Sequence, residues 1–69
     1  MSNVEVHYGG EVYTVVGQTV DDVQAQITEM LMSGIPGWLT AYDGHGSRNP
    51  FRLLIATGIP LSVAMAPSG

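Results

Sequence analysis

Two alternating segments around Gly9-Gly10 constrain the fold of this chain more than any other feature. The stretch NVEVHYGGEVYTVV, residues 3–16, is rich in Val and Tyr on both sides of the glycine pair. A two-residue hairpin turn needs positive φ, which glycine adopts readily, and such a turn fixes the strand register. We therefore predict an antiparallel hairpin of residues 3–8 and 11–16. The turn places opposite one another Tyr8 and Glu11, His7 and Val12, Val6 and Tyr13, Glu5 and Thr14, and Val4 and Val15.

This register separates an apolar face from a mixed face. Side chains alternate along a strand, so every second residue of the hairpin points to the same side. An antiparallel sheet tolerates water on a face only when that face is polar enough. Val12 and Val16 lie on the mixed face, and we predict that they are surplus apolar surface available to a partner. The apolar face, which we expect in the core, consists of Val4, Val6, Tyr8, Tyr13 and Val15.

A helix of about 14 residues is predicted to begin at Thr19 or Val20, because apolar residues recur there at helical spacing. Thr19 is a favourable N-cap, and Asp22 stands three positions later, where a capping box places its carboxylate. Gly34 suits the left-handed position that ends a helix, and Pro36 prevents continuation. The apolar stripe comprises Val20, Val23, Ile27, Met30 and Leu31, whereas Met32 falls outside it.

Strands are also expected at residues 37–42, 51–56 and 61–65, where apolar residues alternate between turn residues. The order β-β-α-β-β, with a fifth strand at the end, is typical of an α+β fold: a single small domain with one helix packed on an antiparallel or mixed sheet. A β-grasp-like arrangement fits this order, although the order of strands in the sheet stays open. The domain covers residues 1–69, with an ordered core of about 3–65 and a frayed tail of 66–69.

The composition favours a small acidic domain that associates with another protein. The chain has 69 residues, of which 45% are apolar and 12% charged, and it has no Cys. Domains of this size are often stabilised by disulfides, a metal or a partner subunit, and the lack of Cys excludes disulfides and thiolate metal sites. A formal net charge of −4 with two cations argues against binding to nucleic acid or an anionic membrane. No signal peptide is visible, so a cytoplasmic location is expected.

The stretch AYDGHGSRNPF, residues 41–51, concentrates the reactive side chains. Asp43, His45 and Ser47 could form a hydrolytic site, and the first two could bind a metal with His7. A glycine-flanked loop holds no side chain to catalytic precision, and a metal needs more ligands with supporting contacts. Asp-Gly, Gly-Ser and Asn-Pro are common turn dipeptides. We interpret the stretch as a strand connection, with a role in partner contact as the alternative, and predict no catalytic residue, cofactor site or metal site.

Trp38 and the two arginines complete the candidate interaction residues. Trp38 packs in the core or on a sheet face in one interpretation, and in the other it faces solvent and anchors an interface. Arg48 and Arg52 are the only Lys or Arg residues of the chain. They either pair with a carboxylate such as Asp43 or bind an acidic partner. The candidate interaction set is Val12, Val16, Trp38, Arg48 and Arg52.

The segment GWLTAYDGHGSRNPFRLLIATGIPLSV resembles small α+β proteins of unknown function from actinobacteria and their phages. Such proteins pair a hairpin and a helix with a closing strand, followed by a Gly-Ile/Val-Pro-Ile/Leu turn into a last strand. With the N-terminal hairpin the resemblance covers residues 3–65. It implies a fold and a source, but no activity. The residues that carry it are Gly37, Trp38, Leu53, Leu54, Ile55, Gly58, Ile59, Pro60 and Leu61.

These features predict a small acidic non-enzymatic protein-interaction module. One version is a phage-encoded modulator that docks on a host protein in the host cytoplasm. The alternative is a structural homo-oligomer subunit, for example a homodimer, that associates through its sheet face or an edge strand. An enzyme is disfavoured, because so small a core leaves little room for a pocket of ~300 Å³.

Overall fold

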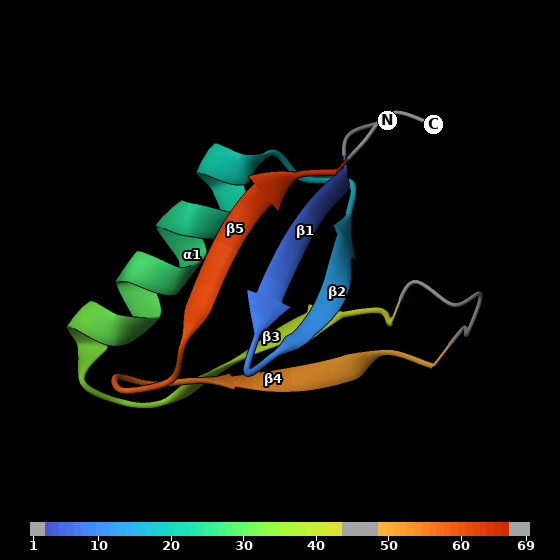
Figure 1. Ribbon diagram of the computed structural model, residues 1–69. Coiled ribbons are helices and arrows are strands. Elements are labelled where there is room, and N and C mark those ends of the chain that lie inside the picture. Colours follow the sequence, from blue (N-terminus) through green and yellow to red (C-terminus); the bar gives the residue numbers. More distant parts are fainter. Residues whose placement is uncertain (1–2, 44–48, 67–69) are drawn as a thin grey trace.

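One helix and five strands make up the described part of the chain, in the order β-β-α-β-β-β (Figure 1). The computed structural model describes residues 3–43 and 49–66. All strand pairs are antiparallel, and they form a three-stranded sheet of order β2-β1-β5 and a two-stranded sheet of β3 and β4. The predicted α+β class is confirmed. The elements are β1 (Asn3–Tyr8), β2 (Glu11–Val16), α1 (Val20–Ser33), β3 (Gly37–Ala41), β4 (Phe51–Ile55) and β5 (Leu61–Met65).

The β1–β2 hairpin has the predicted register throughout. Tyr8 lies opposite Glu11, and Val4 lies opposite Val15. Gly9 and Gly10 have φ values of 58° and 93°, as a primed two-residue turn requires. The predicted division into two faces is confirmed as well. Buried side chains come from Val4, Val6 and Val15 on one face, and exposed ones from Val12 and Val16 on the other.

Helix α1 begins with the predicted capping box. The Asp22 amide donates to Thr19 Oγ1 at 3.1 Å, and the Thr19 amide donates to Asp22 Oδ2 at 3.2 Å. Gly34 ends the helix with φ 73°, in the left-handed region that glycine favours. Leu31, which the apolar stripe includes, is exposed, because it lies at the margin of the stripe in the last turn.

We expect Thr19→Ala to lower the free energy of unfolding by about 1 kcal/mol, because the first turn would lose the acceptor for the Asp22 amide. Thr28→Ala, on the exposed face of the same helix, serves as the control and should change it by less than about 0.5 kcal/mol. Urea denaturation followed by circular dichroism measures both. Equal losses for the two variants would contradict the capping role.

Strand β5 pairs with β1, so the first strand of the chain becomes the centre of the three-stranded sheet. Val4 lies opposite Met65, and Tyr8 lies opposite Leu61. Backbone hydrogen bonds of 3.1 Å flank the pairing at both ends, from the Gly9 amide to the Pro60 carbonyl and from the Ala66 amide to the Asn3 carbonyl. The open question of strand order is thereby answered: the last strand lies beside the first.

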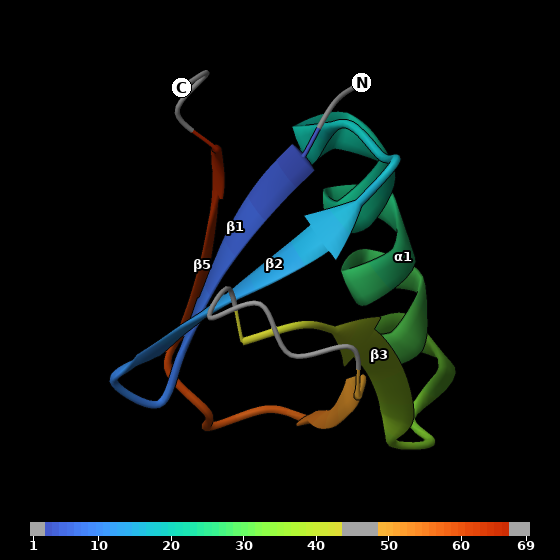
Figure 2. The ribbon, with the colours of Figure 1, turned by 90° about the vertical axis from the view of Figure 1, so that its right-hand side faces the viewer.

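Strands β3 and β4 form a separate hairpin across the lower end of the first sheet (Figure 1). One isolated bridge joins the two sheets: the Thr14 amide donates to the Tyr42 carbonyl at 2.7 Å, and the Tyr42 amide donates to the Thr14 carbonyl at 2.8 Å. The Tyr8 hydroxyl adds a second link by donating to the Leu54 carbonyl at 2.7 Å. Figure 2 shows β3, which precedes Tyr42 along the chain, running at a steep angle to β2. The sheet expected as one layer is therefore divided into two.

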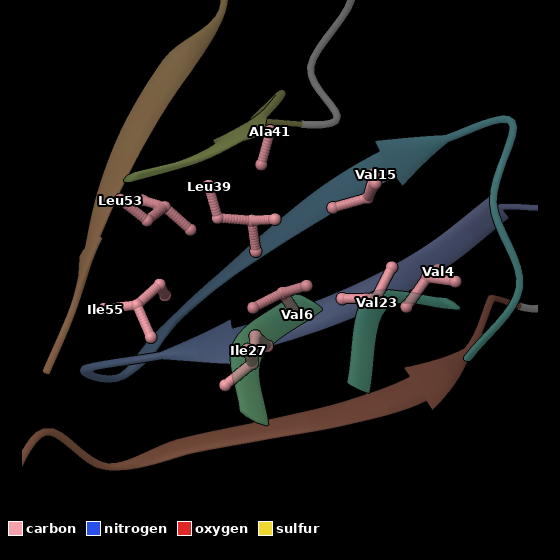
Figure 3. Close-up of a cluster of buried hydrophobic side chains, with 9 residues drawn as sticks. All are labelled: Val4, Val6, Val15, Val23, Ile27, Leu39, Ala41, Leu53 and Ile55. Carbon is pink, nitrogen blue, oxygen red and sulfur yellow. The ribbon is translucent and has the colours of Figure 1, made fainter. Parts of the chain in front are cut away.

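The core lies where both sheets and the helix converge (Figure 3). Two residues on the inward side of their strands are exposed instead of buried. Met65 keeps the predicted face of β5 but is 78% exposed, because it lies at the open end of an edge strand. Phe51, at the start of β4, is exposed as well but contacts Tyr13 with a ring separation of 5.4 Å. The buried residues are Val4, Val6, Val15, Val23, Ile27, Leu39, Ala41, Leu53 and Ile55.

Candidate functional site on the outer sheet face

The bridge between Thr14 and Tyr42 makes the outer sides of both sheets one surface. Residues directly opposite one another in an antiparallel pair point to the same side. Thr14 belongs to the outer side of β2, and Tyr42 continues the outer side of β3. We call this surface the outer face. Its residues are Glu5, His7, Val12, Thr14, Val16, Ser62 and Ala64 on the first sheet, and Trp38, Thr40, Tyr42, Arg52 and Leu54 on the second.

The part of the outer face on the first sheet is mixed in chemistry. Val12 is 45% exposed and Val16 is 48% exposed. His7 lies opposite Val12, and its Nε2 atom is 3.5 Å from Glu5 Oε1. Because both side chains are partly exposed to water, this contact contributes little to stability. The two valines are thus exposed beside polar groups, as the sequence predicts.

The part of the outer face on the second sheet is built around Trp38, which is 60% exposed. Trp38 lies outside the core, because the inward positions of β3 belong to Leu39 and Ala41. Leu54 lies directly opposite Trp38 on β4, and the exposed Arg52 follows on the same side. An exposed Trp with a neighbouring Leu and a nearby Arg has the composition of an interface anchor.

The bridge brings four of the candidate interaction residues onto this one surface: Val12, Val16, Trp38 and Arg52. Trp38 is about 13 Å along β3 from Tyr42 at the bridge. Arg48 lies outside the described residues, and so do His45 and Ser47. The pairing of Arg48 with Asp43 therefore stays a prediction.

Three hollows of the surface lie away from the outer face. One, of about 500 Å³, is open and lies over the solvent side of α1, where no second element forms an opposite wall. A second, of about 390 Å³, is open as well and lies between α1 and the start of β3. The third, of about 120 Å³, lies between the end of α1 and the β4–β5 connection. The exposed Ile35, which the sequence analysis did not single out, borders the second and third; the signal was an isolated apolar residue between Gly34 and Pro36. All three hollows are lined mainly by apolar surface.

Residues 3–43 and 49–66 contain no group of three or more His, Asp or Glu side chains placed to hold a metal ion. No helix in these ranges is long and apolar enough to cross a membrane. No family model, curated protein or solved structure matches the chain.

Proposed function

We propose that the protein is a small non-enzymatic protein-interaction module that binds a partner protein through its outer face, with Trp38 as the anchor. The observation that carries the proposal is the exposure of Trp38 beside Leu54, on a sheet whose other side is occupied by the core. Covering an exposed Trp side chain contributes roughly 2–4 kcal/mol. Trp38 is the largest side chain among the exposed apolar residues of the described ranges.

The chemistry of the outer face favours a partner with an apolar patch and a nearby carboxylate. Arg52 is exposed two residues from Leu54 and faces the same side. A carboxylate of the partner can accept hydrogen bonds from this guanidinium in two parallel directions, which fixes the orientation of binding. The apolar patch would cover Trp38 and extend toward Val12 and Val16.

The narrower form of the proposal is a phage-encoded modulator that binds a host protein in the host cytoplasm. Its support is the resemblance of residues 37–61 to small proteins of actinobacteria and their phages. This form decides which cell extract is used in the test.

We expect the immobilised protein to retain a specific partner from an actinobacterial lysate, and Trp38→Ala to reduce that retention at least about tenfold. Val12→Lys should weaken it too, because a charge would face the apolar patch. Met32→Ala, on the solvent side of α1, is the matched control and should leave retention unchanged. Quantitative mass spectrometry of the bound fraction measures the effect. If the Trp38 and Val12 variants retain the same proteins as the parent chain in equal amounts, the proposal is wrong.

A further inference from the structure

Strand β5 presents a row of backbone groups that pair with no other strand of the described ranges. The hydrogen bonds at its two ends, from the Ala66 amide to the Asn3 carbonyl and from the Gly9 amide to the Pro60 carbonyl, fix which residues face β1. In an antiparallel pair the hydrogen-bonding direction alternates from residue to residue. Ser62 and Ala64 therefore bond to β1. The amides and carbonyls of Leu61, Val63 and Met65 point to the open edge, where no other strand of the described ranges pairs with them.

The outward edges of β2, β3 and β4 are each engaged at or next to one residue. On β2, the outward amide and carbonyl of Thr14 are taken by Tyr42. On β4, the Leu54 carbonyl accepts a hydrogen bond from the Tyr8 hydroxyl, and Arg52 places a charge on the edge. Blocked and charged edges are the usual protection against strand pairing. Strand β5, with the sequence LSVAM, has no charged residue and no proline.

We propose that β5 pairs with β5 of a second copy of this chain, about a twofold axis that passes beside Val63. The outward-facing residues of each copy then meet one another: Val63 with Val63, and Leu61 with Met65. Each of these pairs exchanges two backbone hydrogen bonds. The two three-stranded sheets become one six-stranded sheet with β5 of each copy at its centre.

The side chains match in this arrangement as well as the backbone does. Leu61, Val63 and Met65 share the inner face of β5, so the pairing of Leu61 with Met65 of the second copy covers a side chain that is 78% exposed in the single chain. Ser62 meets Ala64 of the second copy on the outer face. Both are small and uncharged, so no like charges meet at the axis.

Helix α1 supports the same partner. One side of the helix faces β3, where Met30 packs closely on Gly37; a Cβ at Gly37 would lie 2.7 Å from Met30 Cγ. The opposite side lies toward β5, which runs beside the helix (Figure 1). In the dimer, the two helices flank the axis on the same face of the sheet. Gln24 and Thr28 lie on the exposed helix surface next to that side, with Asp21 one turn earlier.

This self-association is independent of the proposed partner. The outer-face anchor Trp38 lies on the second sheet and stays uncovered, so the dimer would present two copies of the binding surface. Each copy contributes one five-residue strand and one side of a helix to the dimer contact. Such a contact is small for a protein interface and buries less than about 1,200 Å² of accessible surface in total. We therefore expect a weak, reversible dimer that is populated enough to detect when the chain concentration is in the millimolar range.

The first experiment is analytical ultracentrifugation of the full chain over a range of concentrations. We expect the mass to shift from monomer to dimer, and Val63→Pro to abolish the shift. Proline removes an amide that faces the open edge and leaves the bonds to β1 intact. Because Val63 also packs on the core, a second variant, Ala64→Lys, tests the edge without touching packing and should raise the dissociation constant at least about tenfold. Ala25→Lys, on the solvent side of α1, is the matched control and should not change it.

The second experiment tests the register, using the absence of Cys from the chain. Ser62 and Ala64 of the second copy form a non-hydrogen-bonded pair with a Cα separation of about 4.5 Å, which a disulfide can span. A mixture of Ser62→Cys and Ala64→Cys chains should oxidise to a linked species, and either variant alone should do so much less.

A chain that sediments as a monomer at about 1 mM overturns the proposal. Equal cross-linking in the mixture and in the single variants overturns the register. Loss of a lysate partner in Ala64→Lys but not in Trp38→Ala, with the chain itself monomeric, would assign the edge to a strand of another protein and overturn the second copy as occupant. Because Ala64 also belongs to the outer face, this comparison with Trp38→Ala separates the failure of this proposal from the failure of the proposed function.

Discussion

Replacing Leu39 by Ala is expected to lower the free energy of unfolding by about 2–5 kcal/mol, the cost of removing a large side chain from a closed core. Leu39 is 2% exposed and lies where the second sheet meets the other buried side chains (Figure 3). A domain of this size has a total stability of about 3–10 kcal/mol. The substitution therefore removes much of the stability of the domain. Thermal and urea denaturation measure the loss.

Trp38→Ala is the matched control, because it alters the neighbouring residue of the same strand on the opposite side. Although Trp is the larger side chain, we expect a loss of less than about 1 kcal/mol, since it lies outside the core. The two variants together test which side of β3 is buried. A larger loss for Trp38→Ala than for Leu39→Ala would reverse the assignment of the two sides.

Thr14→Pro is expected to separate the two sheets at their bridge, at a cost of about 2–4 kcal/mol. The Thr14 amide faces Tyr42 rather than β1, so proline removes one bond of the bridge and none of the hairpin. The cost has two parts: the lost hydrogen bond, and the Tyr42 carbonyl left without its donor. Amide hydrogen exchange should show faster exchange at Tyr42 while the amides that join β1 and β2 stay protected.

Val12→Pro provides the comparison. Val12 is two residues away on the same strand, so its amide also points away from β1. Edge positions of this kind tolerate proline. We expect a loss at least about 1 kcal/mol smaller than that of Thr14→Pro. If the two prolines cost the same, the bridge contributes nothing and the hairpin alone explains the effect.

The local elements could be predicted from the sequence because each is determined by neighbouring residues. Gly9-Gly10 permits one kind of turn, and the turn fixes the pairing of the hairpin residue by residue. Thr19, Asp22 and Gly34 likewise fix the ends of α1 through contacts within one or two turns. In each case the stabilising contacts span only a few positions along the chain.

The long-range arrangement could not be predicted in the same way. Alternation in LSVAM indicates which residues share a side, but every strand with an open edge is an equally good neighbour. Strand β3 is ambiguous in another respect, because Trp38 on one side and Leu39 on the other are both apolar. Only the packing of the helix and both sheets around Leu39 decides which side is buried. The candidate residues Val12 and Val16 followed from the hairpin, but their continuity with Trp38 depends on the bridge at Thr14.

The pairing of the first strand with the last has a consequence for the kinetics of folding. β1 leaves the ribosome early, but its neighbour β5 follows only after residues 61–65 are synthesised. Contacts between distant positions close large loops, and proteins rich in them fold slowly. The β1–β2 hairpin and α1 can form on the nascent chain, while β1 waits with one side unpaired. Folding to the native state therefore ends with the arrival of β5, and a pause in synthesis before that point leaves an open strand exposed to other chains.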